Sequence, residues 1–412
     1  MDMSALFTLA LGLQAPWKVA GLTFDEKASR LDLSVDFAAG STFPCPECQA
    51  ASKVHDTAEK TWRHLNFFQH QTYLSARQPR VDCASHGVKQ VAVPWARPGS
   101  GFTLMFEAFV LLLAQNMPMA AVARVVREHD TRLWRIVRHH VDDGLSRLDL
   151  SGVRRVGLDE TSRARGHDYL TLFVDADAAR VIGIVLDRSA EVVSEFKQWF
   201  VERGGDPEKI TDFSLDMSPA YIKGVAENFP RAKLTFDKFH VIKLANDAVD
   251  EVRREEQRTL KAPELKKTRF LFLRNEKNLS EVQKERLDAA RAVARKTSRA
   301  YFHRETLQEL YRQPDATEAA AFFKRWHRGA SRCRLKPVRR VAKTLKDHLP
   351  GLLRWFDSRV TNAILEGFSS LVQAAKAAAR GYRNATYMAS MIFLRLGKLD
   401  LRLPPLASAQ SI

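Results

Sequence analysis

The stretch Val153–Leu186 reads VRRVGLDETSRARGHDYLTLFVDADAARVIGIVL and decides the fold of the chain's central part. Three short apolar runs within it are rich in β-branched residues, and each predicts a strand: Val153–Leu158, Tyr169–Val174 and Val181–Leu186. A helix is predicted over Ala190–Arg203. This order indicates three antiparallel strands followed by a covering helix.

The segment that follows alternates strands with helices. Ile210–Leu215 and Leu234–Phe236 are predicted as strands, with a helix over Pro219–Asn228 between them. The complete order, β-β-β-α-β-α-β, is that of a ribonuclease-H-like fold, in which parallel crossovers follow three antiparallel strands. In such a sheet the first and fourth strands lie side by side. We therefore expect a multidomain α+β protein with a ribonuclease-H-like α/β core.

Three acidic residues stand at informative places in this pattern. Asp159 ends the first predicted strand, Asp216 ends the fourth, and Glu366 lies in a predicted helix over Asn362–Arg380. Carboxylates at the ends of adjacent strands repel each other unless cations sit between them. Two Mg²⁺ (or Mn²⁺) ions held there would suit the cleavage and transfer of phosphodiesters. A single strand-end aspartate more often caps a turn, so the prediction depends on the combination.

Neighbouring polar residues offer alternatives. Glu160 is expected on the face of the strand opposite to Asp159, because side chains alternate along a strand. Asp237 follows the last strand and caps the next helix, supports the acidic site without touching a metal ion, or binds a metal ion directly. His240 either orients a phosphate or carboxylate or is a structural histidine.

The N-terminal region carries a metal-binding pattern. Cys45 and Cys48 form a C-x₂-C turn, and Cys83 and His86 form a C-x₂-H pair 35 residues later. Two such chelating turns on separate hairpins suit a tetrahedral Zn²⁺ ion, and four protein ligands leave no open position for catalysis. The alternative is three free thiols and a loop histidine. Cys333 is expected to be a lone thiol.

Strands and a linker frame this pattern. Val19–Phe24, Leu31–Phe37 and Trp62–Tyr73 are predicted as strands. The Pro- and Gly-rich residues from Pro94 to Gly101 are predicted to be a linker.

Helical periodicity begins at residue 103. Helices are predicted over Thr103–Gln115, Met119–Glu128 and Thr131–Asp142, which is the size of a helix-turn-helix. Arginines recur along the second and third helices, and the third helix would enter the major groove of DNA. The alternative is an ordinary helical bundle with basic surface residues. The proposed DNA contacts are Arg124, Arg127, Arg132 and Arg135.

The charge distribution also indicates a polyanionic partner. The chain has 412 residues, a net charge of +17 and a pI near 9.8. Residues 251–350 hold 27 Lys and Arg against 13 Asp and Glu, an excess of 14. The run Lys324–Lys346 holds ten basic residues and no acidic one, which favours contact with a phosphate backbone. The proposed phosphate contacts are Lys324, Arg325, Arg328, Arg334, Arg339 and Arg340.

Trp326 lies within this run and allows two interpretations. It is either a core residue of the helical region or an aromatic that stacks on a displaced base.

Export and membrane insertion are not expected. The apolar stretch Ala5–Leu13 lacks a preceding basic segment and a cleavage site, and Phe102–Ala114 is too short to span a bilayer. We therefore expect a cytoplasmic protein.

Several stretches together resemble the ISL3 family of insertion-sequence transposases over nearly the whole chain. They are the Cys45/Cys48/Cys83/His86 pattern with His86-Gly87-Val88, Val93-Pro94-Trp95-Ala96-Arg97, Gly157-Leu158-Asp159-Glu160, Leu215-Asp216-Met217-Ser218-Pro219-Ala220-Tyr221, Phe236-Asp237-Lys238-Phe239-His240-Val241, Leu365-Glu366-Gly367 and Gly381-Tyr382-Arg383-Asn384. The resemblance implies a catalytic triad of Asp159, Asp216 and Glu366, with the third acid following a helical insertion.

The resemblance also implies a domain order. We expect a zinc-binding domain over 1–98, a helix-turn-helix over 99–150, a catalytic core over 151–237, a basic helical insertion over 238–349 and a catalytic helix and tail over 350–412. The implied partners are double-stranded DNA, as the element's terminal inverted repeats and as target, and further copies of the chain in a homodimer or larger assembly.

Two other functions compete with this one. A DNA-binding regulator derived from a transposase would not need three converging carboxylates. A structure-specific nuclease of the ribonuclease-H type would not need both a zinc domain and a helix-turn-helix.

Overall fold

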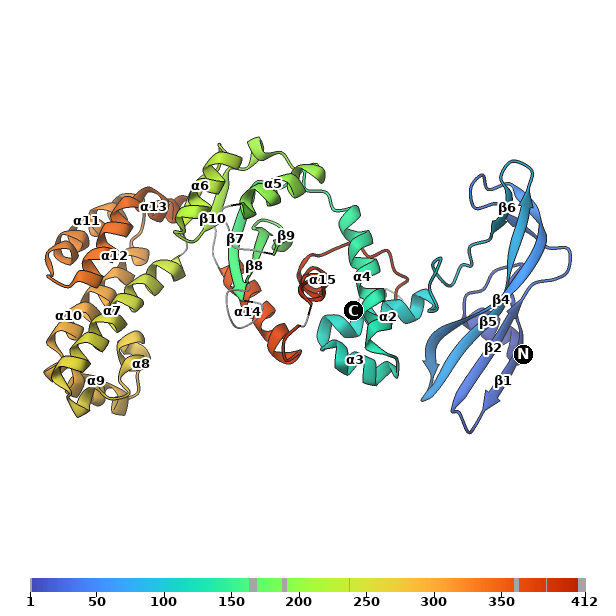
Figure 1. Cartoon of the computed structure of the whole chain (residues 1–412), viewed down its shortest axis with the longest axis horizontal. Helices are drawn as coiled ribbons and strands as arrows, with labels where there is room; N and C mark the ends of the chain where they lie inside the picture. Colours follow the sequence, from blue (N-terminus) through green and yellow to red (C-terminus); the bar gives the residue numbers. More distant parts are fainter. Residues whose placement is uncertain are drawn as a thin grey trace. The chain divides into compact units, whose positions relative to one another are not determined.

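A computed structural model describes residues 2–162, 169–186, 191–236, 238–358, 363–382 and 384–406 of the chain (Figure 1). The chain forms two compact units. The first comprises Met1–Leu145 together with Asp400–Ile412, and the second comprises Ser146–Leu399. Each unit is described by itself. No helix in the described ranges is long and apolar enough to cross a lipid bilayer.

The first unit begins with a helix and a sheet of six strands. Their bounds are α1 Met3–Ala10, β1 Lys18–Asp25, β2 Arg30–Asp36, β3 Thr42–Pro44, β4 Ala51–Phe67, β5 His70–Cys83 and β6 Gly87–Gln90. The strand order is β1-β2-β5-β4-β3, with β6 also paired to β5. Strands β2 and β5 run parallel, whereas the other pairs are antiparallel.

The long hairpin of β4 and β5 corrects one expectation from the sequence. The single strand predicted over Trp62–Tyr73 is two strands, which reverse between Phe67 and His70. Alternating residues on both strands fill the core beneath the sheet, including Trp62, Leu74 and Val81, each at most 1% exposed. The apolar residues of this stretch predicted a strand, but the turn within it contains neither glycine nor proline, which are the strongest turn signals.

Three helices complete the first unit: α2 Leu104–Asn116, α3 Met119–Val126 and α4 Asp130–Ser146. Thr103 caps α2 by accepting a hydrogen bond from the Phe106 backbone N–H at 3.3 Å. Glu107 on α2 is fully buried, and its carboxylate accepts hydrogen bonds from Arg97, Ser100 and His140. This buried network ties the linker before α2 to α4.

The second unit contains a five-stranded sheet. Its strands are β7 Arg155–Ser162, β8 Tyr169–Asp175, β9 Arg180–Val185, β10 Asp212–Leu215 and β11 Lys233–Phe236, in the order β11-β10-β7-β8-β9. β7, β8 and β9 are antiparallel neighbours, whereas β10 pairs parallel to both β7 and β11. The first and fourth strands of this sheet are therefore adjacent, as the sequence predicts.

Helices near the sheet in sequence pack against it. They are α5 Val192–Glu202, α6 Pro219–Asn228, α13 Leu349–Ser358, α14 Ala363–Ala378 and α15 Ala385–Leu396. Phe196 of α5 stacks on Phe173 of β8 with ring centroids 3.8 Å apart. Helix α13, which was not predicted as a helix of its own from the sequence, packs on β11.

The helical region between β11 and α13 folds into a bundle of its own, drawn in yellow to orange in Figure 1. Its helices are α7 Lys238–Leu260, α8 Arg269–Leu273, α9 Glu281–Val293, α10 Arg295–Gln308, α11 Ala316–Arg332 and α12 Lys336–Asp347. Helix α7 packs against both α10 and α12, so this long helix is central to the bundle.

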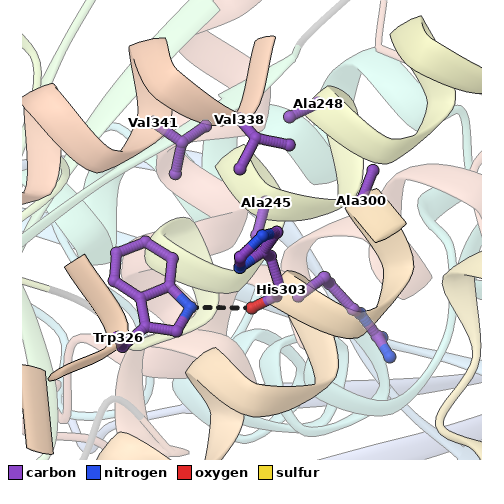
Figure 2. Close-up of a pocket in the computed structure, with 8 residues that line it drawn as sticks. Ala245, Ala248, Ala300, His303, Trp326, Val338 and Val341 are labelled. Atoms are coloured by element: carbon purple, nitrogen blue, oxygen red, sulfur yellow. Dashed lines mark hydrogen bonds between the residues drawn. The ribbon is translucent and has the colours of Figure 1, made fainter. Parts of the chain in front are cut away.

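Trp326 of α11 belongs to the core of this bundle. Its side chain is 6% exposed, and its indole N–H donates to the His303 carbonyl oxygen at 2.9 Å. Figure 2 shows the indole beside a small pocket lined by residues of α7, α10 and α12. A ring held in this way presents no free face to a nucleotide. The interpretation of Trp326 as a base-stacking residue is therefore wrong.

Candidate functional site

The pairing of β7 with β10 aligns two of the three predicted acids. Asp212, Phe213 and Ser214 of β10 pair with Arg155, Val156 and Gly157 of β7. Asp159 and Asp216 each lie two residues beyond the last pair, Gly157 and Ser214. Because side chains alternate with a period of two, this register puts both aspartates at the same level and, as the backbone continues, on one face.

Both carboxylates also accept local backbone hydrogen bonds. Asp159 Oδ1 accepts from the Glu160 N–H at 2.9 Å, and Asp216 Oδ1 accepts from the Ser218 N–H at 2.9 Å. The second bond closes the turn into α6, with Ser218 at its N-cap and Pro219 at its first position. Both side chains are partly exposed, which leaves them accessible to ions from solvent.

Helix α14 lies along β7 on the side where Asp159 points. The Ser369 hydroxyl donates to Asp159 Oδ2, and one turn further on the Gln373 amide donates to Thr161. A third contact, from the Lys376 ammonium to the Ser162 carbonyl oxygen, continues this series. The three α14 residues are three or four positions apart, so they lie on one face of the helix, and this face follows β7.

The start of α14 fits closely against the same strand. A Cβ atom built on Gly157 would lie 2.6 Å from Leu365 Cδ2 and 3.1 Å from Leu365 Cγ. Leu365 is 6% exposed, so its side chain is held in that contact. Glu366 is the next residue of α14, and the helix therefore starts beside the strand that carries Asp159.

Glu366, Asp237 and His240 are the other residues predicted at or near the acidic site. The backbone of Glu366 is helical within α14, but its side chain lies outside the described residues, as does the whole of Asp237. His240 is the third residue of α7 and is half-buried, with its ring 5.6 Å from that of Phe239. A role for Asp237 or His240 behind the acidic site stays a prediction.

Glu160 points away from this group, as expected. Its carboxylate accepts a hydrogen bond from the hydroxyl of Tyr221, which lies on α6. Glu160 therefore contacts α6, whereas its neighbour Asp159 contacts α14.

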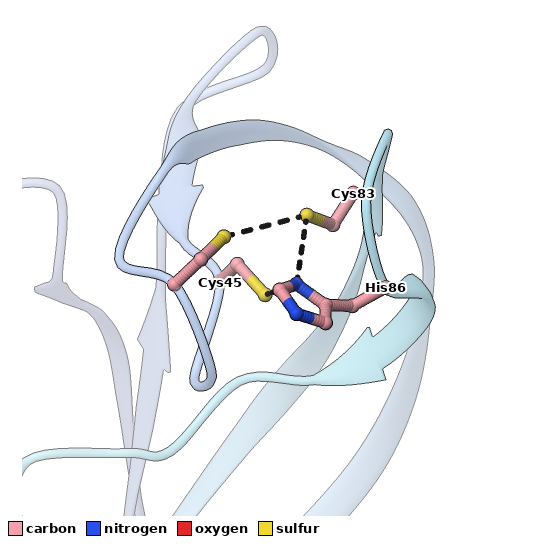
Figure 3. A group of neighbouring side chains, drawn as sticks. Cys45, Cys83 and His86 are labelled. Carbon is pink, nitrogen blue, oxygen red and sulfur yellow. Dashed lines mark hydrogen bonds between the residues drawn. The ribbon is translucent and has the colours of Figure 1, made fainter.

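The four predicted zinc ligands converge at the ends of two hairpins (Figure 3). Cys45 and Cys48 lie in the turn between β3 and β4, whereas Cys83 ends β5 and His86 lies in the turn from β5 to β6. The pairing of β4 with β5 brings these turns together, since Val54 pairs with Val81. The four ligand atoms all lie within 4.8 Å of one another.

The distances fit a tetrahedral ion. Cys48 Sγ lies 3.6 Å from Cys83 Sγ, and His86 Nδ1 lies 3.6 Å from Cys83 Sγ and 3.8 Å from Cys45 Sγ. Zinc–ligand bonds of about 2.0–2.3 Å put ligand atoms about 3.5–3.8 Å apart. Backbone hydrogen bonds from Ser85 and His86 lower the pKa of the Cys83 thiol, which favours the metal-binding thiolate.

A carboxylate lies beside the ring nitrogen of His86 that faces away from the thiols. Nδ1 of this histidine faces the thiols, while Nε2 lies 3.6 Å from Glu47 Oε2. Glu47 also pairs with Lys89 at 2.6 Å. A carboxylate behind a ligating histidine orients the ring and raises its basicity. Glu47 was not predicted from the sequence, although its place inside the Cys45–Cys48 turn was the available signal.

The arginines of the helix-turn-helix differ in their surroundings. Arg132 pairs with Glu128 at 2.8 Å, and its guanidinium lies 4.5 Å from the ring centroid of Phe102. Arg124, Arg127 and Arg135 are exposed and make no ion pair within the described part of the chain. Arg138, one turn beyond Arg135 on α4, is exposed in the same way. Arg135 and Arg138 are therefore more available to a ligand than Arg132.

The basic run is divided between α11 and α12. Every one of its ten Lys and Arg side chains is exposed, because Trp326, Val338, Val341 and Leu345 turn the opposite faces of these helices into the bundle. Arg340 pairs with Glu251 of α7. The other nine make no ion pair within the described part of the chain: Lys324, Arg325, Arg328, Arg332, Arg334, Lys336, Arg339, Lys343 and Lys346.

Comparisons with protein families match three successive parts of the chain. A family model described as a transposase, the catalytic model of the ISL3 type, matches residues 156–392, which is more than half of the chain. The helix-turn-helix domain of transposase family ISL3 matches residues 91–141. The zinc-finger of the transposases of IS204, IS1001, IS1096 and IS1165 matches residues 41–86, which include all four clustered ligands.

Curated proteins of similar sequence agree with these matches. The transposase for insertion sequence element IS1557 of Mycobacterium tuberculosis is 27% identical over 382 residues, covering 85% of each chain. The transposase for insertion sequence element IS1001 of Bordetella parapertussis is 25% identical over 351 residues, covering 83% of this chain and 86% of its own.

Proposed function

The chain belongs to the ISL3 family of insertion-sequence transposases, and we propose that Asp159, Asp216 and Glu366 form the site that cuts DNA and joins it to new DNA. The alignment of Asp216 with Asp159 across β7 and β10 carries this proposal. The strand order and the β10–β7 crossover further support a ribonuclease-H-like fold for the catalytic core.

The chemistry of these residues fits hard divalent cations. Carboxylate oxygens are the ligands that Mg²⁺ and Mn²⁺ prefer, and the register gathers two carboxylates on one face. When bound, two such ions would activate the attacking oxygen and stabilise the leaving one. The chain's own part is to fix the carboxylates: β7 and β10 hold the aspartates, and the fit of Leu365 on Gly157 seats the helix that carries Glu366.

DNA recognition is divided between two surfaces in this proposal. Helix α4 would read base edges of the element's terminal inverted repeats with Arg135 and Arg138. The exposed basic face of α11 and α12 would hold phosphates, which carry no sequence information. Because two ends of an element must be cut together, we also propose a homodimer or larger assembly on DNA.

The test uses single alanine variants of Asp159, Asp216 and Glu366, with Asp177→Ala as the matched control. Asp177 is an exposed acid of the same sheet that pairs with Arg155 at the opposite end of β7. Cleavage of a supercoiled plasmid carrying the gene's own flanking sequence is measured with Mg²⁺ or Mn²⁺, beside binding of that sequence. We expect each triad variant to bind but not cleave, and the control to do both.

Cleavage near the wild-type rate by any triad variant would show that this residue is wrongly assigned. Binding without cleavage by the wild-type chain would instead favour the regulator.

A further inference from the structure

We propose that Glu160 and Tyr221 form a positioning pair that fixes the strand of Asp159 against the segment that carries Asp216. This inference rests on the proposed function of the two aspartates. Both residues of the pair belong to motifs that the catalytic triad leaves unexplained: Glu160 follows Asp159 directly, and Tyr221 follows Asp216 by five residues.

The contact joins strand β7 to helix α6 within the second unit. Tyr221 is 1% exposed, and its hydroxyl donates to Glu160 Oε1. Thr171 of β8, which is fully buried, lies directly opposite Glu160 in the β7–β8 pairing. Its hydroxyl is 3.4 Å from the Tyr221 hydroxyl, so three polar groups meet within a mostly apolar layer.

Burial makes this contact specific. A buried polar group costs free energy unless it is hydrogen-bonded, and the cost is greater for a charged one. Burial, followed by the hydrogen bond to Glu160, raises the pKa of Tyr221, so its hydroxyl stays protonated and able to donate. The buried Tyr221 hydroxyl therefore keeps the partly exposed Glu160 carboxylate as its acceptor only while α6 and β7 hold their present relation.

The pair closes a short ring of structure around the two aspartates. From Gly157 the ring runs along β7 to Asp159 and Glu160, crosses to Tyr221, returns through the start of α6 to Asp216, and closes at the Ser214–Gly157 pairing. Strand pairing alone fixes the ring at one point. The Glu160–Tyr221 bond fixes it at a second, on the far side of both carboxylates, and so limits changes in their separation.

A competing role for Glu160 is that of a metal ligand. The geometry opposes it, because adjacent residues of a strand point to opposite faces and Glu160 contacts α6 whereas Asp159 contacts α14. A ligand and a positioning residue also respond differently to substitution. A carboxylate ligand cannot be replaced by an amide without loss, whereas an amide oxygen still accepts a hydrogen bond from tyrosine.

The experiment compares Tyr221→Phe, Glu160→Gln, Glu160→Ala and the double variant Tyr221→Phe/Glu160→Ala in the full-length chain. Plasmid cleavage is measured over a range of Mg²⁺ concentrations. Mn²⁺ binding is measured separately by loss of the free-ion paramagnetic resonance signal, and melting temperature is recorded for each variant.

We expect Tyr221→Phe and Glu160→Ala to raise the metal concentration for half-maximal cleavage and binding by about tenfold, the lower end for groups that orient metal ligands. The double variant should need no higher a metal concentration than the more impaired of the two single variants, because both substitutions remove the same interaction. Glu160→Gln should remain within about threefold of the wild type, since it keeps the acceptor.

Two results would overturn the positioning role. Loss of cleavage at all metal concentrations in Glu160→Gln, with Tyr221→Phe unaffected, would make Glu160 a ligand. A lowered melting temperature with unchanged metal requirements would make the pair merely structural. Asp159→Ala separates the two proposals: if it still cleaves and binds Mn²⁺ normally, the catalytic assignment fails whatever the pair does.

Discussion

The contact between Gly157 and Leu365 allows a sharp test of how the helix of Glu366 is held against the sheet that carries the two proposed catalytic aspartates. Gly157 lies on β7 two residues before Asp159, and Leu365 directly precedes Glu366 on α14. Replacement of Gly157 by alanine adds one methyl group at a close contact between this helix and this strand. We expect the added methyl group to push the start of α14 away from β7.

The distances set the size of the effect. The new Cβ would lie 2.6 and 2.9 Å from the two Leu365 methyl carbons and 3.1 Å from Cγ, whereas ordinary carbon contacts are about 3.5–4.0 Å. The methyl groups end a flexible side chain, but Leu365 is 6% exposed and has little space to rotate. Overpacking of this kind costs about 1–3 kcal/mol. A displacement of catalytic groups by about 1 Å can lower the rate by about 100-fold.

Gly183→Ala is the matched control. A Cβ on Gly183 of β9 would lie 2.7 Å from Phe196 Cδ2 of α5, so this variant overpacks the same sheet without touching α14. Both variants should lower the melting temperature of the second unit. Only Gly157→Ala should also lower Mg²⁺-dependent plasmid cleavage, and adding Leu365→Ala should restore part of it by making room.

The reasoning would be refuted by a Gly157→Ala chain with wild-type melting and cleavage. It would also be refuted by equal losses of cleavage in the two variants. Either result would mean that the seat of α14 on β7 does not set the position of Glu366.

Three further predictions concern the first unit and the basic face. The purified chain should contain about one zinc ion, and Cys48→Ser should lose it and expose roughly the first hundred residues to proteolysis, whereas Cys333→Ser should not. Burial, aided by the charge of Arg63, lowers the pKa of His64 to about 4, so the folded state binds fewer protons than the unfolded state between pH 6.5 and 4. Stability of the first unit should therefore fall by roughly 2–3 kcal/mol as the pH drops through that window, and a His64→Gln chain that keeps the same slope would contradict this. Alanine at Lys343 and Lys346 should weaken binding to terminal and random duplexes alike and flatten the log–log salt dependence by about two units, whereas alanine at Arg135 and Arg138 should reduce the preference for terminal sequence; the reverse pattern would contradict the division.

Local sequence patterns predicted the sheet of the second unit well. Short β-branched runs bounded by polar turns located β7 to β11 within a few residues, and proline at the first position located α6 over Pro219–Asn228. The expected end of the first strand at Asp159 was wrong, because pairing with β8 continues β7 to Ser162 and leaves Asp159 inside the strand. The turn between β4 and β5 was not located, because the alternation continues across it and Phe67, Phe68 and Gln69 are not typical turn residues. Helix α13 was not predicted as a separate helix, because the helices predicted from the sequence end near Leu349 and resume at Asn362.

The sites were predictable where ligands lie close in sequence. Cys45, Cys48, Cys83 and His86 stand at hairpin turns, and their spacing alone indicated the cluster that the structure shows. The contacts of Ser369 and Tyr221 were not predictable, because each depends on a helix packing against a strand about 60 or 200 residues away. The exposed basic residues followed from charge, but Arg132 and Arg340 have acidic partners that depend on helix packing.

The long separation of Glu366 from the aspartates has a structural explanation in where the helical bundle begins and ends. Helix α7 starts directly after β11, and α13 returns to pack on β11, where a Cβ on Gly351 would lie 2.3 Å from Phe236. Arg354 of α13 also donates to Asp212 of β10 at 2.9 Å. Because the chain leaves and re-enters at one edge of the sheet, the length of the bundle between these points need not alter the path from α13 to α14. An insertion of this kind can therefore add an exposed basic surface while the start of α14, which carries the proposed third acid, keeps its place beside β7.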